Sequence, residues 1–170
     1  MSSGPASRPS PGRLALRPET AADESFRLAL FRVSRGPGWD SLPPRVLDMI
    51  MAQQFHVQTQ GYRAAHPKAR LRIITLDDAP VGRLADDRMA DAIHLIDIAI
   101  TPPWRGRGVG TTVIRDLMNE AAAAALPLVL QTARDNLAAQ QLYERLGFVT
   151  TSASATHLSM AWQAPLVDAT

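Results

Sequence analysis

The sequence contains no cysteine, and its apolar stretches are short. Without cysteine the chain can form neither a disulfide framework nor a zinc site built on thiolates. A helix that crosses a membrane needs about 20 mostly apolar residues in a row, so we expect no membrane partner. Residues 1–12 are rich in proline and serine and lack the apolar segment of a signal peptide. This predicts a disordered tail and a cytoplasmic protein.

An excess of either charge is also missing. The 18 basic and 16 acidic residues leave a net charge of +2, too small to indicate a nucleic acid partner. The four histidines lack metal-ligand spacing, so no metal is expected. No G-x-S-x-G element indicates a hydrolase. With 170 residues, of which 46% are hydrophobic, the chain has material for one core. We predict a single domain over residues 13–163, followed by a tail at 164–170.

What the chain does contain is an apolar strand that runs into a glycine-rich loop and a helix. Residues 95–100 are apolar except for Asp97 and rich in isoleucine, which is typical of a strand buried on both faces. Two prolines end this strand. Residues 105–110 then read R-G-R-G-V-G, and apolar residues recur at helical spacing from Thr111 onward.

Such a loop predicts a phosphate site, because it leaves backbone N–H groups uncovered at the positive end of the helix dipole. A G-x-x-x-x-G-K-[ST] loop is excluded, since no lysine stands nearby, and the G-x-G-x-x-G fingerprint fails because Thr111 occupies its third glycine position. The pattern that fits is R-x-x-G-x-G, carried by Arg105, Gly108 and Gly110. Glycines that only turn the chain would leave Arg105 and Arg107 unexplained.

Another informative stretch lies some twenty residues further on. A short apolar strand at 128–130 is followed by a helix that Asp135 or Asn136 caps. The helix closes with L-Y-E-R-L-G-F at 142–148, where Gly147 is placed to end it.

Together the two stretches resemble the GNAT superfamily of acyl-CoA N-acetyltransferases, over residues 94–149. The glycine-rich stretch is similar to the family's R-x-x-G-x-G cofactor motif. The later stretch is similar to the family's closing motif N-x-x-A-x-x-L-Y-x-x-x-G-F, which is carried here by Asn136, Ala139, Leu142, Tyr143, Gly147 and Phe148.

The resemblance implies an α/β (α+β) fold. Its twisted, mixed and mostly antiparallel sheet has about seven strands, with four helices and a V-shaped wedge between the fourth and fifth strands. Periodicity and turn signals predict strands at 14–17, 70–76, 81–85, 95–100, 128–130, 149–155 and 157–162. A capping box of Thr20 and Asp23 opens the first helix, and Ser41 caps a second that runs to about Ala65. Residues 86–91 are expected to form a charged turn.

The resemblance also implies acetyl-CoA as co-substrate. Its pantetheine arm would lie in the wedge, and its pyrophosphate would rest on the backbone amides of the glycine-rich loop. The residues expected to bind it are Ile98, Ile100, Arg105, Gly106, Arg107, Gly108, Val109, Gly110 and Asn136.

Two residues are expected to carry the chemistry. Tyr143 matches the tyrosine that faces the leaving sulfur in the family. At the position of the general base the sequence differs from several branches of the family. Ile96 stands where polyamine acetyltransferases carry a glutamate, and Gln131 stands where ribosomal-protein N-terminal acetyltransferases carry one. His94 matches the first of two histidines of arylalkylamine acetyltransferases. Alternation along the strand places it on the face of Ile96, Ile98 and Ile100, with Asp97 on the opposite face unless a bulge changes the register.

We therefore predict an N-acetyltransferase, a monomer or homodimer, that acts on a primary amine, with a small molecule favoured over a protein N-terminus. The competing hypothesis is an acyl-CoA-binding module without catalytic activity. Gln54, Gln58 and Tyr62 share one face of the second helix. They form either a solvated surface or a polar wall of the acceptor site.

Overall fold

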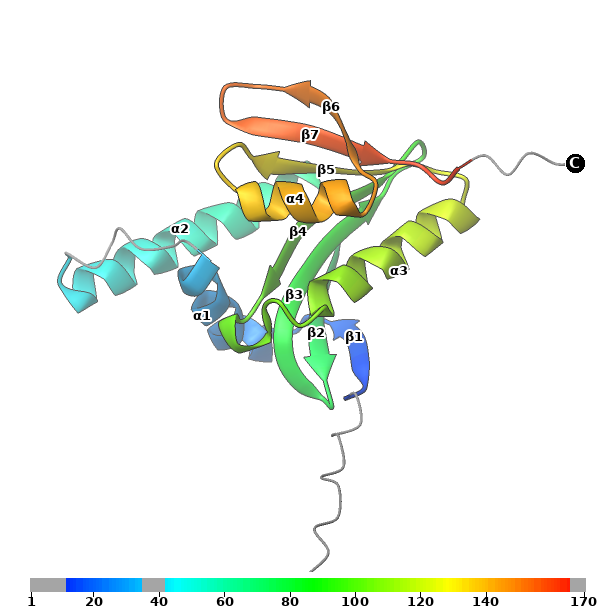
Figure 1. Cartoon of the computed structure of the whole chain (residues 1–170). Coiled ribbons are helices and arrows are strands. Elements are labelled where there is room, and N and C mark those ends of the chain that lie inside the picture. Colours follow the sequence, from blue (N-terminus) through cyan, green and yellow to red (C-terminus); the bar gives the residue numbers. More distant parts are fainter. Residues whose placement is uncertain (1–11, 35–41, 166–170) are drawn as a thin grey trace, which may run out of the picture.

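The computed structural model describes residues 12–34 and 42–165. Its centre is one seven-stranded sheet of order β1-β2-β3-β4-β5-β7-β6, in which only the β4–β5 pair is parallel. Figure 1 shows the sheet with its helices around it. The elements in chain order are β1 (Leu14–Pro18), a short 3-10 turn (Ala21–Asp23), α1 (Glu24–Ser34), α2 (Pro44–Ala65), β2 (Arg70–Leu76), β3 (Ala79–Arg88), β4 (Ile93–Ile100), α3 (Val109–Ala123), β5 (Leu128–Ala133), α4 (Leu137–Arg145), β6 (Val149–Ala153) and β7 (His157–Trp162). This mixed, mostly antiparallel sheet with four α-helices confirms the predicted fold.

The main core lies between the sheet and α3. Apolar residues of α3 recur on one face of the helix, as an amphipathic helix on a sheet requires, and Val113, Ile114 and Leu117 are buried there. They pack against sheet residues such as Leu84 and Leu128. A second, smaller core joins α1 and α2 through the residues Phe31, Met51 and Phe55.

The predicted wedge opens where β4 and β5 part. The two strands pair only from Ile93↔Leu128 to Leu95↔Leu130, although β4 continues to Ile100 along β3. The second half of β4 is therefore only partly buried, whereas the sequence pattern predicted burial on both faces.

A β-bulge in β4 corrects one prediction. Asp86 of β3 pairs with Leu95 and Ala85 with Asp97, which leaves Ile96 without an opposite residue. An extra residue reverses the alternation of side chains beyond it. His94 consequently shares a face with Asp97, while Ile98 and Ile100 turn toward the core under α3. The expectation that His94 lies on the face of Ile98 and Ile100 is wrong.

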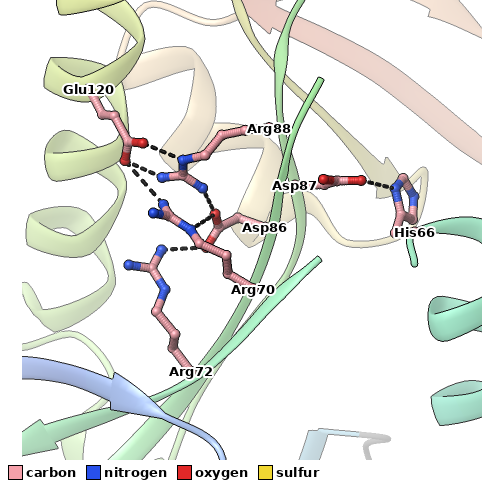
Figure 2. A network of polar contacts seen from close by, with 7 residues as sticks. All are labelled: His66, Arg70, Arg72, Asp86, Asp87, Arg88 and Glu120. Atoms are coloured by element: carbon pink, nitrogen blue, oxygen red, sulfur yellow. Dashed lines mark hydrogen bonds and ion pairs between the residues drawn. The ribbon is translucent and has the colours of Figure 1, made fainter. Parts of the chain in front are cut away.

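The predicted charged turn at 86–91 is also wrong in its first half, because β3 continues to Arg88. Asp86 is completely buried. Its carboxylate accepts hydrogen bonds from the guanidinium groups of Arg70, Arg72 and Arg88 (Figure 2). These partners come mainly from the neighbouring strand, so a linear pattern of charges does not reveal them.

Helix starts differ slightly from the expectations. Helix α3 begins at Val109, two residues before the predicted Thr111, and the first helical turn of α2 follows Pro43. The expected Ser41 cap and most of the two predicted tails lie outside the described residues. Within 12–34 and 42–165, no helix is both long and apolar enough to cross a membrane.

Candidate active site

The glycine-rich loop between β4 and α3 forms one wall of a groove of about 500 Å³. Gly106 and Gly108 have left-handed backbones, with φ of 69° and 82°. Gly108 is the N-cap of α3, and no side chain caps that helix. The first N–H groups of α3 are therefore open to a ligand at the positive end of the helix dipole.

The space next to two glycines of the loop supports the fit of a phosphate group to this groove. A Cβ built on Gly108 would meet no protein atom within 4 Å, and one on Gly110 would stand 3.7 Å from the Ile100 Cγ1, an ordinary contact. Glycine in the first turn of a helix lowers its stability relative to alanine. Because packing does not require glycine at 110, the space in front of it is available to a ligand.

The arginines around the groove differ in what they do. The Nε of Arg105 donates to the carbonyl of Ile100 at 2.8 Å, and Arg105 also lines the groove. Arg107 instead stacks its guanidinium over Trp104, 5.2 Å from the ring centroid. Arg145 of α4 lines the groove as well. The motifs missed this third arginine, although the spacing of Ala138, Leu142 and Arg145 along α4 would have placed it on the same helix face.

Between the parted strands lies a cavity of about 190 Å³. Predicted residues that it brings together are Ile98, Asn136 and Tyr143. The N–H of Thr101 donates to the Val81 carbonyl of β3 at 2.9 Å. Because backbone groups alternate along a strand, the N–H groups of Ile98 and Ile100 point the other way, into the wedge.

Tyr143 lines this cavity from α4. Its ring is buried and lies 5.6 Å from that of Phe148. Burial, and next the nearby carboxylate of Asp97, raise the pKa of Tyr143 to about 12. The phenol therefore keeps its proton throughout the neutral and moderately alkaline range, and it can act as a hydrogen-bond donor.

Asn136 is partly committed to the fold. Its Oδ1 accepts a hydrogen bond from the N–H of Ala139 at 3.2 Å and thereby caps α4. The cap explains why this residue type stands at the start of the helix. The side-chain NH₂ group makes no hydrogen bond with the described residues, and it remains available to a molecule in the wedge.

The wedge opens into a larger cavity of about 720 Å³, which lies between the end of α2 and the strands β4, β5 and β7. The residues that line both cavities are Leu95, Ile96, Asp97, Leu130, Gln131 and Ala133. Three of the four histidines, His66, His94 and His157, line the larger one. Of the α2 face considered above, Tyr62 reaches this cavity, and the Gln58 Nε2 donates to its hydroxyl at 3.1 Å.

Asp97 stands at the junction of the two cavities, where sequence analysis did not place it. The bulge at Ile96 turns its side chain toward the face of His94, and 32% of that side chain remains exposed. Burial raises the pKa of Asp97, whereas Arg83, at 3.7 Å, and the N–H of Ile98 act in the opposite direction. This position depends on the bulge, and no residue pattern in the sequence indicates where the bulge forms.

His94 lies on β4 directly opposite Asp87 of β3. Its ring centroid is 5.9 Å from that of His66, the residue that ends α2. No group of three or more potential metal ligands occurs within 12–34 and 42–165.

The comparisons with known proteins agree with this geometry. A family model described as the acetyltransferase (GNAT) family matches residues 40–148. The PaiA N-acetyltransferase from Thermoplasma acidophilum, solved in complex with coenzyme A, is 11% identical over 89% of this chain and 99% of its own, with a TM-score of 0.69. The ribosomal-protein-S18-alanine N-acetyltransferase from Escherichia coli is 18% identical over 89% and 94%, with a TM-score of 0.61.

A GNAT family acetyltransferase from Elizabethkingia anophelis, solved with acetyl-CoA bound, is 13% identical over 89% of this chain and 98% of its own, with a TM-score of 0.58. At these identities the likeness concerns the fold. A search of curated proteins finds no significant match to the chain.

Proposed function

Because the chain belongs to the acetyltransferase (GNAT) family, we propose that it transfers the acetyl group of acetyl-CoA to a primary amine of a small molecule. The observation that carries the proposal is the continuity of three spaces. A groove with an uncapped helix N-terminus adjoins the wedge beside Tyr143 at Ala139, and the wedge shares six lining residues with the cavity that contains His94.

The co-substrate fits the residues of the groove and the wedge. The first N–H groups of α3, together with Arg105 and Arg145, suit the pyrophosphate. The N–H group of Ile100 and the NH₂ group of Asn136 suit the extended pantetheine arm. Acetyl-CoA supplies a thioester carbonyl, which an amine can attack.

In this proposal the N–H of Ile98, a residue that lines the wedge together with Tyr143, donates to the carbonyl oxygen, on which negative charge develops. A backbone donor of this kind typically contributes about 3–4 kcal/mol to the stability of the transition state. Tyr143 donates a hydrogen bond to the leaving sulfur. Full transfer of its proton would be uphill by about 5 kcal/mol, because its pKa of about 12 lies far above that of a thiol, about 8.5.

The amine must lose a proton before it attacks. A lysine-like amine has a pKa of about 10.4, so freeing its lone pair at pH 7 costs roughly 4.6 kcal/mol. His94 lines the acceptor cavity, and an imidazole is the side chain best suited to accept a proton near neutral pH. We assign it this task, with a water molecule between it and the amine.

Two features favour a small molecule over a protein N-terminus. The acceptor cavity of about 720 Å³ falls in the usual range of small-molecule sites, about 300–1,000 Å³. Gln131 lines this cavity, at the position where the resembled ribosomal-protein N-terminal acetyltransferases carry a glutamate.

The test is a panel of primary amines and peptides, screened for release of free thiol from acetyl-CoA. We expect turnover with at least one small amine and slower turnover with peptides. Faster turnover with peptides would show that the acceptor is a peptide or protein N-terminus and not a small molecule. Binding of acetyl-CoA without thiol release from any amine would favour an acyl-CoA-binding module.

Co-substrate binding has its own test in Gly110→Glu. The backbone at Gly110 is not left-handed, so the substitution leaves the helix intact, but it places bulk and negative charge in the groove. Calorimetry should show loss of acetyl-CoA binding. The matched control is Gly61→Glu in α2, where a side chain meets no neighbour within 4 Å. Equal affinity of the two variants would contradict the assignment of the groove.

A further inference from the structure

A second histidine in the acceptor cavity has a side-chain hydrogen-bond partner, whereas His94 has none among the described residues. His66 ends α2, and its backbone is held on both sides, because its N–H donates to the Tyr62 carbonyl at 2.8 Å and its own carbonyl accepts from the N–H of Ala69 at 3.0 Å. The side chain reaches across to β3, where its Nδ1 lies 3.1 Å from the Oδ2 of Asp87 (Figure 2). The position of the ring is thus fixed by its backbone and by one carboxylate.

Asp87 is buried, with 6% of the residue exposed. Among the described residues, His66 is the only hydrogen-bond partner of its carboxylate. A buried carboxylate strongly favours a proton-carrying neighbour. We therefore assign the shared proton to Nδ1 of His66, which leaves Nε2 as a proton acceptor.

His66 and His94 line the same cavity and their ring centroids are 5.9 Å apart, a separation that one water molecule can bridge. The titratable groups that face this pair are Tyr62 from α2, Asp87 from β3, Asp97 from β4 and His157 from β7. Strand β5 contributes the neutral Gln131. Among the described residues, no arginine, lysine or glutamate lines the cavity.

The two remaining candidates for proton acceptance are occupied elsewhere. Asp97 faces Arg83, and the Nδ1 of His157 lies 2.9 Å from the hydroxyl of Thr156, on an exposed residue. His66 keeps 24% of its side chain exposed, which gives a proton a path to solvent. A base that lines the cavity, is oriented by a buried carboxylate and touches solvent is suited to carry protons away from the acceptor.

We propose that His66, oriented by Asp87, is a second proton acceptor of the acceptor site and works as a pair with His94. This inference rests on the proposed acetyl transfer. The N–C bond to the acetyl group forms, the C–S bond breaks, and CoA leaves as a thiolate that accepts a hydrogen bond from Tyr143. The protonated amine gives up two protons in all. One passes through His94 to Nε2 of His66 and then to water before the attack, and the other leaves the nitrogen as the tetrahedral intermediate collapses and protonates the thiolate through water. Asp87 is a positioning residue, and nothing is oxidised or reduced.

The decisive variant is His66→Asn. An asparagine amide can keep a hydrogen bond to Asp87 in place of Nδ1–H, but it cannot accept the proton. We expect kcat/KM at pH 7 to fall about 10–100-fold, while the Kd for acetyl-CoA by calorimetry stays within about twofold. The loss should shrink as the pH approaches the pKa of the amine, since the substrate then arrives neutral. The control His56→Asn lies on the same helix but outside this cavity, and it should retain wild-type kinetics.

Asp87→Asn and the double variant with His94→Ala complete the test. Asp87→Asn should lower kcat/KM at pH 7 by about tenfold, because the imidazole of His66 loses the carboxylate that orients it and fixes its tautomer. The loss should shrink at high pH, as it does for His66→Asn. If the histidines act as a pair, His66→Asn added to His94→Ala should reduce kcat/KM by less than about twofold further.

The failures are distinguishable. An active wild type with a His66→Asn variant that keeps both its kcat/KM and its pH profile would overturn the pair and leave the proposed function standing. The same conclusion would follow from fully multiplicative effects in the double variant. A wild type that releases no thiol with any amine would overturn the proposed function, and the pair with it.

Discussion

Asp86 and Asp87 are neighbours in β3, yet they serve opposite sides of the sheet (Figure 2). Asp86 is completely buried on the α3 side, and three guanidinium groups, from Arg70, Arg72 and Arg88, surround it. Asp87 on the other side contacts one imidazole, at the edge of a cavity. The carboxylate of Asp86 is surrounded by guanidinium groups, which stay charged at any physiological pH. The carboxylate of Asp87 is paired with an imidazole, a type of side chain that can gain and lose a proton near neutral pH.

The Asp86 cluster extends to α3 through Glu120, which receives hydrogen bonds from Arg70 and Arg88. Burial, and next the charge of Arg70, lower the pKa of Arg72, while Glu120 acts in the opposite direction. None of these residues lines the three spaces of the candidate site. A buried charge alone therefore does not indicate a functional site. A buried charge with a titratable partner that lines a cavity is a better indication of one.

The largest effect is expected for Asp86→Asn. This isosteric change removes the charge of a completely buried carboxylate that three partly exposed guanidinium groups share. Removal of one partner from a buried ion pair typically costs about 3–5 kcal/mol of unfolding free energy. Urea unfolding should show this loss, while the folded fraction keeps its affinity for acetyl-CoA. Asp78→Asn in the exposed β2–β3 turn is the control. If Asp86→Asn lost less unfolding free energy than Asp87→Asn, the proposed contrast between a structural and a functional carboxylate would be wrong.

His94→Ala tests the functional side of the sheet. We expect kcat/KM near neutral pH to fall by up to about 100-fold, which equals roughly 2.7 kcal/mol in the barrier. Urea midpoints should change little, because His94 is only partly buried. A pH–rate profile that overlays the wild type would remove His94 from the mechanism.

Tyr143→Phe sharpens the distinction between a hydrogen-bond donor and a proton donor. Since burial raises the pKa of Tyr143 to about 12, the phenol stays protonated up to at least about pH 10. We expect kcat to fall about tenfold, a barrier change of roughly 1.4 kcal/mol. The factor should be the same at every pH from about 6 to 10. A loss that changed with pH in this range would indicate proton transfer from the phenol. Acetyl-CoA affinity serves as the control for intact folding.

Asp23 provides a third arrangement, a carboxylate at the start of a helix with a half-exposed cation. The guanidinium of Arg17 and next the N–H of Thr20 hold the pKa of Asp23 well below its usual range. A lowered folded-state pKa stabilises the fold above the unfolded value, about pH 4, and this contribution is lost as the pH falls further.

Asp23→Asn should therefore lower the unfolding free energy at pH 7 by roughly 0.5–1 kcal/mol, the smallest of these effects. Thermal unfolding should show the gap between variant and wild type narrowing below about pH 4. A gap that stayed constant down to about pH 2 would mean that the carboxylate charge contributes nothing.

Local signals in the sequence predicted much of the candidate site. The glycine-rich loop lies between a strand and a helix as predicted, and Gly147, with φ of 92°, follows the end of α4 as expected. The carboxylate of Asp23 accepts a hydrogen bond from the N–H of Thr20, as the capping box predicted, while the Thr20 hydroxyl donates to the same carboxylate instead of capping the helix. Asn136 and Tyr143 come together at one cavity through the helix that their motif describes.

The predictions that failed depend on how strands pair. Strand alternation placed His94 with Ile98, but the bulge at Ile96 moves Asp97 to its side instead. The register of β3 with β4 decides where a bulge forms, and residues far apart in the sequence contribute to that energy. The turn expected at Asp86 became a strand for a similar reason, because two arginines from β2 and Arg88 compensate its charge.

By itself the sequence determined what a few consecutive residues decide through backbone sterics and helix periodicity: the glycine-rich loop, the helix ends and the order of the elements. The tertiary structure alone decided which side chains meet. His66 and Asp87 are 21 residues apart along the chain, and they meet beside His94 only because α2 ends over the β3–β4 pair. Such contacts depend on the packing of elements whose relative placement no local pattern encodes.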